Sequence, residues 1–258
     1  MKWSTHRQIA RFIARFIPYP SFLTKELVEG STDPDINKDR PHHQPDPNCI
    51  LKYIWDAREA FHENDLKKAF RNLGRACHYI QDMLIENNRE HNSLEESLRN
   101  ERIRDDLIEE GFQQGIHSYR QLKNIIFKRI GPLKSPKQIM KDSCEISALV
   151  AKAVISKENP PGKLIDDFLS AKRRYHHKTL PFSLLISLIL LFISLATHNF
   201  PISPLFLVAS ILCGFLIPQL DPDYNYLKQE MNWYGCSKIV TLITPSLPTS
   251  SSLPYLES

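Results

Sequence analysis

Apolar residues recur every three or four positions along most of the first 157 residues, and no stretch alternates apolar with polar residues. That spacing is typical of amphipathic helices, whereas a half-buried strand would show strict alternation. The clearest stripe consists of Leu66, Phe70, Leu73, Cys77, Ile80 and Leu84. Comparable patterns predict further helices over residues 5–17, 21–29, 48–62, 91–111, 121–130 and 135–156. We therefore expect an all-α domain that spans residues 1–158.

The hydrophobic pattern changes at Asn159-Pro160-Pro161-Gly162. A basic linker helix is expected within residues 159–179, and residues 180–196 and 200–220 are then almost wholly apolar. Each apolar stretch is close to the roughly 17–25 residues that a helix needs to cross a bilayer. Residues 184–192 have no polar face, which favours a membrane over the alternative of a buried pair of core helices. We therefore interpret residues 180–220 as a transmembrane helical hairpin.

Charge and composition set the expected location of each part. The basic run at residues 172–178 precedes the first apolar stretch, and the positive-inside rule assigns such a flank to the cytoplasm. The N-terminal domain and the C-terminal tail, residues 221–258, would then both be cytoplasmic, with residues after 241 largely disordered because they are rich in Ser, Pro and Thr. The net charge of +4 is too small to indicate a nucleic-acid-binding protein by itself. Five cysteines without CxxC spacing do not predict a disulfide framework.

Two pairs of candidate metal ligands lie close together in the sequence. His78 and Asp82 are four residues apart, as are His91 and Glu95, and residues with that spacing share one face of a helix. Each pair therefore offers an imidazole and a carboxylate to one metal ion, although a helix ion pair is the simpler interpretation of either pair alone. At about 100° per residue, an unbroken helix would direct the two pairs to nearly opposite faces. We therefore predict that the helix carrying His78 ends before His91, near residues 87–88.

Further candidate ligands lie upstream of these pairs. His6 falls on the apolar face of the first predicted helix, where a lone histidine is usually a core residue. A polar loop after the second predicted helix contains Asp33, Asp35, His42 and His43. Such a loop can be an ordinary solvated turn, but loops held by a scaffold also carry functional residues.

Gly74 lies one turn before His78, inside a predicted helix. Glycine at such a position costs roughly 1 kcal/mol relative to alanine. We therefore expect another segment to pack close to the backbone at Gly74.

The candidate ligands form an ordered set on a helical frame: Trp3, His6, Asp33 or Asp35, His42 or His43, His78-x-x-x-Asp82 and His91-x-x-x-Glu95. This set resembles the zinc-dependent phospholipase C family and the related fungal single-strand-specific nucleases, whose helical domains hold three zinc ions. The resemblance covers residues 3 to about 130. Its most specific parts are the His-Tyr-x-x-Asp segment that begins at His78 and the later His-x-x-x-Glu segment.

The resemblance implies a role for each residue. Asp82 would bridge two metal ions. His78, one of Asp33 or Asp35, and one of His42 or His43 would complete the first site, His6 would serve the second, and His91 with Glu95 would serve a third. The family's chain begins at a tryptophan whose free amine and carbonyl bind zinc, which makes Trp3 a candidate ligand.

The sequence departs from the family's pattern at two places. Met1 and Lys2 precede Trp3, so both would have to be removed to free its amine. Asn88 stands where the family has a further histidine, and asparagine binds zinc poorly. We therefore expect two zinc ions rather than three.

The expected activity is metal-dependent hydrolysis of a phosphodiester. Zinc lowers the pKa of bound water to about 7, and a pair of metals can clamp the attacking and leaving oxygens. Asp33 or Asp35 is the candidate catalytic base. The apolar hairpin favours a phospholipid or a lipid-linked phosphate as substrate, so membrane lipid is the expected partner, and no protein partner is predicted.

Two alternatives to this activity stay open at this stage. One is a nuclease for single-stranded nucleic acid, which requires aromatic stacking platforms such as Tyr53, Trp55 or Tyr79. The other is a non-catalytic, membrane-anchored metal-binding module. A second group of residues flanks the apolar hairpin and could either hold a metal or simply mark the membrane interface: His176, His177, His198, Asp221 and Asp223.

Overall fold

The computed structural model describes residues 1–37, 46–85, 91–116, 118–132, 135–197, 199–200, 202–219 and 221–236, and only the backbone of residues 91, 92, 215 and 218. Within those ranges the chain is all-helical and contains no β-strand. The chain divides into two compact units, Met1–Asn159 and Pro160–Ser258. The boundary between them falls beside the composition break at Pro160 and Pro161.

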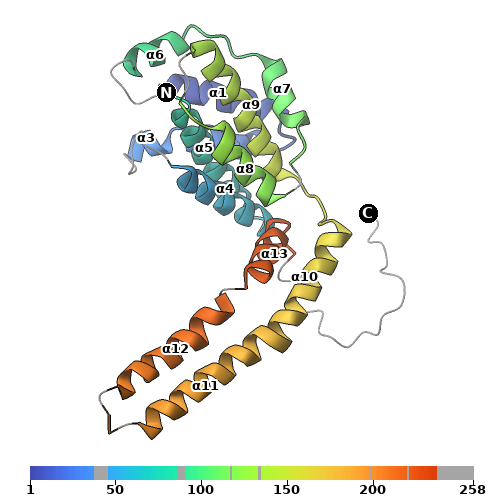
Figure 1. Ribbon diagram of the computed structural model, residues 1–258. Helices are drawn as coiled ribbons and strands as arrows, with labels where there is room; N and C mark the ends of the chain where they lie inside the picture. Colours follow the sequence, from blue (N-terminus) through green and yellow to red (C-terminus); the bar gives the residue numbers. More distant parts are fainter. Residues whose placement is uncertain are drawn as a thin grey trace. The chain divides into compact units, whose positions relative to one another are not determined.

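The first unit is a helical domain, which runs from blue to yellow-green in Figure 1. Its helices are α1 (Trp3–Phe16), α2 (Ser21–Gly30), α3 (Asp33–Asn37), α4 (Pro47–His62), α5 (Leu66–Met83), α6 (His91–Leu98), α7 (Asp105–Gln113), α8 (Tyr119–Arg129) and α9 (Pro136–Ile155). The central helix is α5, which packs against α1, α2, α4 and α9. Its apolar stripe is buried from Phe70 onward, so the periodicity in the sequence identified the face that forms the core.

The ends of α5 follow from local chemistry. Asp65 caps its N-terminus by accepting a hydrogen bond from the backbone N–H of Lys68 at 3.2 Å, which satisfies an amide that no helical carbonyl reaches. The helix ends at Met83, and α6 begins at His91. This confirms that the helix carrying His78 ends before His91, a few residues earlier than residues 87–88, which lie outside the described part of the chain.

The helices α2 and α5 cross at close range because two glycines meet there. A Cβ atom added to Gly74 would lie 2.3 Å from the carbonyl oxygen of Leu27 and 2.7 Å from the amide nitrogen of Ser31. A Cβ atom added to Gly30 would lie 2.2 Å from the carbonyl oxygen of Arg71. The expected close packing at Gly74 is therefore confirmed. The crossing also brings Ser31, at the end of α2, against the face of α5.

The single helix predicted over residues 91–111 was wrong, because this segment forms two helices, α6 and α7. The apolar spacing changes between them, since Leu98 and Ile103 are five residues apart rather than three or four. Ile103 is still buried. A non-helical link lets it reach the core, whereas a continuous helix would turn its side chain away.

The second unit contains α10 (Gly162–Arg174), the π-helical turn η1 (Tyr175–Thr179), α11 (Leu180–Ala196), α12 (Ser203–Gln219) and α13 (Pro222–Trp233). The first three form one continuous helix, Gly162–Ala196, which is long and apolar enough to span a membrane by length and composition. The helices α11 and α12 lie antiparallel, and α10 packs on α13 (Figure 1). We refer to α11 and α12 as the apolar hairpin.

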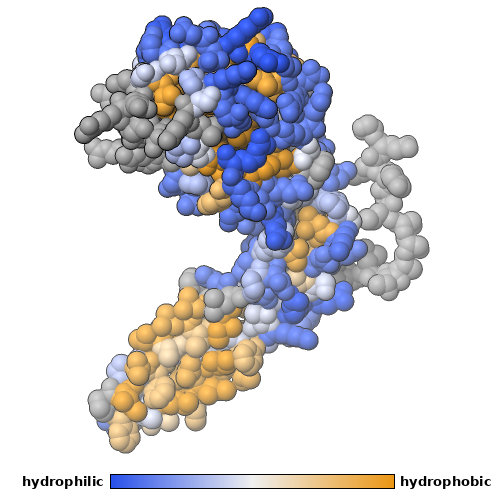
Figure 2. Space-filling view, turned by 45° about the horizontal axis from the view of Figure 1, so that its top comes forward, coloured by the Kyte–Doolittle hydropathy of each residue, from blue (hydrophilic) through white to orange (hydrophobic). Residues whose placement is uncertain are grey.

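The apolar hairpin buries serines and exposes large apolar side chains. Ser183 donates a hydrogen bond to the carbonyl oxygen of Cys213 at 3.0 Å, Ser187 donates to that of Ser210 at 2.9 Å, and Ser194 donates to that of Ser203 at 2.9 Å. The outer faces carry Phe182, Leu184, Leu185, Leu188, Ile189, Phe192, Leu195, Leu205, Leu207, Val208, Ile211, Leu212 and Leu216. Figure 2 shows the resulting continuous apolar surface.

Candidate metal centre

Three predicted ligands converge inside the first unit. His6 on α1 and His78 and Asp82 on α5 each present one potential ligand atom, and these atoms lie within 4.8 Å of one another. The two imidazole rings are 4.2 Å apart between centroids. All three residues are buried. Since buried ionisable groups are rare unless they are paired or coordinate a metal, this group is the candidate metal centre.

The orientation of the His78 ring follows from the close crossing of α2 and α5. Its Nδ1 lies 3.0 Å from the carbonyl oxygen of Ser31, and a carbonyl only accepts, so Nδ1 carries the proton. Nε2 therefore points to Oδ2 of Asp82 at 3.2 Å and to Oδ1 of Asp35 at 3.7 Å. In a neutral ring this nitrogen bears a lone pair that faces two carboxylates, an arrangement that a cation, either a proton or a metal ion, stabilises.

The same carboxylates govern the protonation of His78. Burial lowers the pKa of this imidazole, but Asp82 and Asp35 outweigh burial and hold the pKa above its ordinary value. The two carboxylates therefore favour a positive charge at Nε2.

The His6 ring is held by a glutamine. Its Nδ1 lies 2.7 Å from Oε1 of Gln81, and Nε2 of Gln81 donates to Oγ of Ser147 on α9 at 3.1 Å. This leaves Nε2 of His6 facing Oδ1 of Asp82 at 3.3 Å and the carbonyl oxygen of Met1 at 3.0 Å. Burial and the neighbouring His78 lower the pKa of His6 below its ordinary value. The lowered pKa favours the neutral imidazole, which is the form that metal binding requires.

The first residue of the chain reaches the same cluster. The amino group of Met1 lies 2.7 Å from Oδ1 of Asp82 and 2.8 Å from Oε1 of Glu95. Burial lowers the pKa of this amine, but the two carboxylates outweigh burial and raise the pKa above its ordinary value. The resemblance implied these backbone groups for Trp3 after removal of Met1 and Lys2; in the chain that carries both residues, the amine at the cluster is that of Met1, and the Trp3 side chain is exposed.

Asp33 and Asp35 have different surroundings, which separates two residues that the sequence left equivalent. Arg71 donates to both carboxylate oxygens of Asp33, at 2.7 and 2.8 Å, and Arg75 donates at 3.1 Å. Burial alone would raise the pKa of Asp33, but the two arginines outweigh it and lower the pKa. The carboxylate oxygens of Asp33 bind guanidinium groups, which disfavours Asp33 as a metal ligand or catalytic base. Asp35 is the one near His78.

Among the remaining predicted ligands, the structure describes the side chain of Glu95 but not those of His42, His43 and His91. Glu95 lies at the cluster through its contact with the Met1 amine. His42 and His43 lie outside the described residues, and so does the side chain of His91, which begins α6.

The charge of the cluster suits a divalent cation. Metal-ligating histidines are neutral, and with neutral imidazoles the carboxylates of Asp35, Asp82 and Glu95 and the single ammonium of Met1 carry a net charge of −2. Imidazole nitrogens and carboxylate oxygens are ordinary zinc ligands. The hydrogen bonds from His78 to Ser31 and from His6 to Gln81 are of the kind that orients histidines in metal sites. The residues present therefore fit a zinc site.

The sequence did not single out Gln81, although a signal was present. Gln81 is four residues after Cys77 and is fully buried with the apolar stripe of α5. A polar side chain at a core position requires a hydrogen-bonding partner, so its register with Cys77 marks it as a residue with a specific contact. That the contact would be His6 did not follow from the spacing.

The second group of candidate residues, beside the apolar hairpin, does not converge on one point within the described residues. Asp221 accepts a hydrogen bond from Thr179 at 3.0 Å, and Asp223 accepts one from Arg174 at 2.9 Å. His176 and His177 are exposed. His198 lies outside the described part of the chain.

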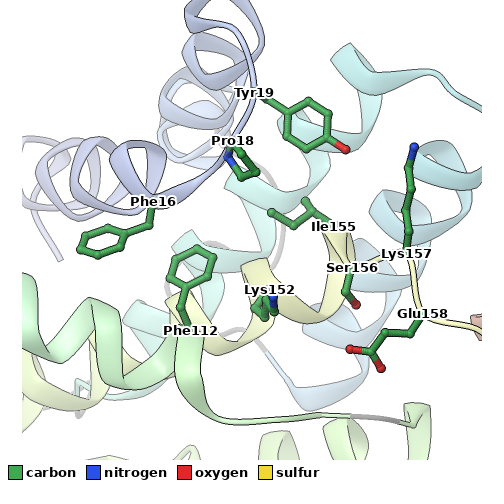
Figure 3. A pocket seen from close by; sticks show the side chains of 9 residues that line it. All are labelled: Phe16, Pro18, Tyr19, Phe112, Lys152, Ile155, Ser156, Lys157 and Glu158. Atoms are coloured by element: carbon green, nitrogen blue, oxygen red, sulfur yellow. The ribbon is translucent and has the colours of Figure 1, made fainter. Parts of the chain in front are cut away.

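A cavity of about 680 Å³ lies elsewhere in the first unit (Figure 3). It is lined by Phe16, Pro18, Tyr19, Phe112, Lys152, Ile155, Ser156, Lys157 and Glu158. None of the predicted ligands lines it, so this cavity is distinct from the candidate metal centre.

Comparisons of the chain with protein-family models, with curated proteins and with solved structures gave no significant match. The site is therefore interpreted from its own geometry.

Proposed function

We propose that this protein is a membrane-anchored, zinc-dependent phosphodiester hydrolase that acts on a phospholipid or a lipid-linked phosphate. The observation that carries the proposal is the buried cluster of His6, His78 and Asp82. Both imidazoles are oriented through Nδ1, and both direct Nε2 toward carboxylate oxygens. The placement of the Met1 amine and carbonyl at this cluster adds support, since the resemblance implies such groups at the metals.

The proposed reaction needs residues that bind zinc and a residue that accepts a proton. A bound zinc ion lowers the pKa of water toward neutrality and polarises phosphoryl oxygens. His6, His78 and Asp82 would hold the metal. Asp35 lies at the edge of the cluster with Oδ1 3.7 Å from His78, so Oδ1 is the oxygen that would accept a proton from the attacking water. Arg71 and Arg75 hold Asp33, two residues earlier in α3.

The second unit supports a membrane anchor. A water-soluble helix pair buries its apolar faces, whereas the apolar hairpin buries serine hydroxyls and exposes leucine and phenylalanine side chains. Small polar residues at the helix contact and apolar residues outside are typical of helices packed in lipid. We infer that α11 and α12 form a transmembrane hairpin. The basic residues before α11 favour a cytoplasmic location for the first unit.

The aromatic residues favour a lipid substrate over single-stranded nucleic acid. Tyr79 is buried at 2 % exposure, and Tyr53 stacks on it with ring centroids 5.5 Å apart. The guanidinium of Arg75 lies 6.0 Å from the centroid of the Tyr53 ring. These rings are engaged with one another and with Arg75, which disfavours them as open platforms for base stacking.

The test uses the full chain in lipid nanodiscs. Zinc content is measured by elemental analysis, and hydrolysis is measured with a chromogenic phosphodiester, a phospholipid and single-stranded DNA. We expect bound zinc and hydrolysis of the phospholipid. Asp82→Asn keeps the shape of the side chain but removes its charge, so bound zinc and hydrolysis should both be lost. Asp167→Asn, an exposed position in α10, is the matched control.

Each other outcome has a defined meaning. Full zinc content in Asp82→Asn contradicts the metal centre. Bound zinc with cleavage of DNA but not of phospholipid supports the nuclease alternative. Bound zinc with no cleavage of any substrate supports a non-catalytic metal-binding module.

A further inference from the structure

Four basic residues form an exposed group where α10 passes into α11. Arg173, His176, His177 and Lys178 are exposed, and we call them the basic collar. The Leu180 amide donates to the carbonyl oxygen of Tyr175, which makes this turn π-helical. Such turns occur often at functional sites.

Tyr175 and Thr179, which flank His176, His177 and Lys178, contact residues at the start of α13. The Tyr175 ring stacks on Tyr224 with centroids 4.3 Å apart, and Thr179 donates to Asp221 at 3.0 Å. These two contacts fix the turn against α13. As a result, His176, His177 and Lys178 are presented together on the outer surface of the second unit.

The charge at this level of the second unit is positive. Arg174 donates to Asp223 at 2.9 Å and lies 4.0 Å from Asp221, so the aspartates at the start of α13 are directed to Arg174. Residues 172–178 contain four lysines and arginines. With neutral histidines, these four cations and the two aspartates leave a net charge of +2.

The apolar surface begins immediately after the collar. The Phe182 side chain is 59 % exposed, and Leu184 and Leu185 follow it on α11. Figure 2 shows the hydrophilic surface giving way to the apolar surface of the hairpin over a short distance. In a bilayer this transition marks the level of the lipid headgroups. With the hairpin spanning a bilayer, as proposed above, the collar lies at the depth of the lipid phosphates.

We propose that the basic collar binds the phosphate groups of anionic phospholipids. The lipid, rather than a soluble phosphate, is the occupant because the collar is continuous with an apolar surface that accepts acyl chains. Lysine and arginine clusters next to a transmembrane helix attract anionic headgroups through charge. This binding does not use the metal centre, so it holds whether or not the protein is a hydrolase.

The experiment compares lipid retention by the full chain. The protein is reconstituted in nanodiscs of phosphatidylcholine and phosphatidylglycerol in equal parts, and the lipids that stay bound after transfer to detergent are counted by native mass spectrometry. We expect phosphatidylglycerol to be retained in preference to phosphatidylcholine. The double variant Arg173→Gln with Lys178→Gln should reduce that preference by roughly ten- to thirtyfold at low salt.

Two matched variants separate charge from other effects. Lys67→Gln with Lys68→Gln removes the same charge from exposed positions on α5 and should leave the preference unchanged. Arg173→Lys with Lys178→Arg keeps both charges and should also leave it unchanged. The proposal is overturned if the unmodified chain retains both lipids equally, or if the α5 variant loses as much preference as the collar variant.

A competition experiment with inorganic phosphate tests whether the collar binds lipid or a soluble anion. Inorganic phosphate, compared with chloride at equal ionic strength, should not displace phosphatidylglycerol. Specific displacement by phosphate would assign the collar to a soluble anion and overturn the lipid proposal. Asp82→Asn should retain phosphatidylglycerol as the unmodified chain does, so failure of the proposed hydrolase and failure of the collar are distinguishable.

Discussion

Replacing Gly74 with alanine should destabilise the first unit, although alanine favours helix. Helix propensity alone would stabilise α5 by about 1 kcal/mol. The added Cβ, however, would lie 2.3 Å from the Leu27 carbonyl oxygen and 2.7 Å from the Ser31 amide nitrogen. Both atoms belong to the backbone of α2, so relief requires the helices to move apart rather than one side chain to rotate.

The expected size of this effect follows from these contacts. Inserting a methyl group into a packed site costs about 1–3 kcal/mol, and two backbone contacts below 3 Å argue for the upper part of that range or beyond. After the gain in propensity, we expect a net loss of about 2 kcal/mol, which lowers Tm by roughly 4–8 °C for a unit of this size. Separation of α2 from α5 also moves the Ser31 carbonyl away from His78, so zinc affinity should fall as well.

The assay is thermal unfolding of the full chain in detergent, followed by far-ultraviolet circular dichroism, together with a zinc titration against a competing chelator. Gly131→Ala is the control, since nothing lies within 4 Å of a Cβ added at Gly131. That variant should be unchanged or slightly more stable, by about 0.4–1 kcal/mol. If Gly74→Ala is as stable as Gly131→Ala and binds zinc equally well, the close crossing is not what positions His78.

The remaining predictions concern the metal centre and one buried ion pair. Gln81→Leu removes the acceptor of the His6 Nδ1 proton, so zinc affinity should fall by roughly ten- to a hundredfold, and an unchanged affinity in a chelator competition would contradict the role of Gln81. Zinc at about a hundred times its Kd should stabilise the folded chain by about 2.7 kcal/mol, an increase in Tm that EDTA should reverse and that Asp82→Asn should lack. Burial raises the pKa of Glu145, but hydrogen bonds from Arg129 and Gln114 outweigh burial and lower the pKa. The stability that this carboxylate contributes is therefore present above the ordinary glutamate pKa, and it is lost as the pH falls through the pKa of Glu145 in the folded protein. Tm should accordingly drop less on acidification in Glu145→Gln than in the unmodified chain, and equal drops would rule out this contribution.

Local pattern was sufficient to predict most of the elements and part of the site, although it joined α6 and α7 into one helix. The apolar stretch over residues 180–196 coincides with α11, and the stripe through Leu73 and Cys77 coincides with the buried face of α5. The pairing of His78 with Asp82 also follows from local geometry, because residues four apart meet on any helix.

Contacts between distant segments could not be predicted in the same way. Asp33 and Asp35 are equivalent by spacing, and the approach of Arg71 and Arg75, which lie 38 and 42 residues after Asp33, separates them. Gln81 reaches Ser147 across 66 residues. The contact of the Met1 amine with Asp82 spans 81 residues and depends on how α1 packs beside α5. Periodicity identifies faces, but it does not identify which faces meet.

The two units obey one rule about buried polar groups, with opposite consequences. In the apolar hairpin, the hydroxyls of Ser183, Ser187 and Ser194 each donate to a backbone carbonyl across the helix contact, so this polarity is balanced within the protein and holds two helices together. In the first unit, hydrogen bonding orients His6 and His78, but the surrounding carboxylates still exceed the single ammonium in charge. A neutral, internally balanced cluster requires no ligand, whereas a buried cluster with excess negative charge is stabilised by a cation. This difference in charge balance, rather than the presence of polar residues in a core, distinguishes the candidate metal centre from the serine contacts of the hairpin.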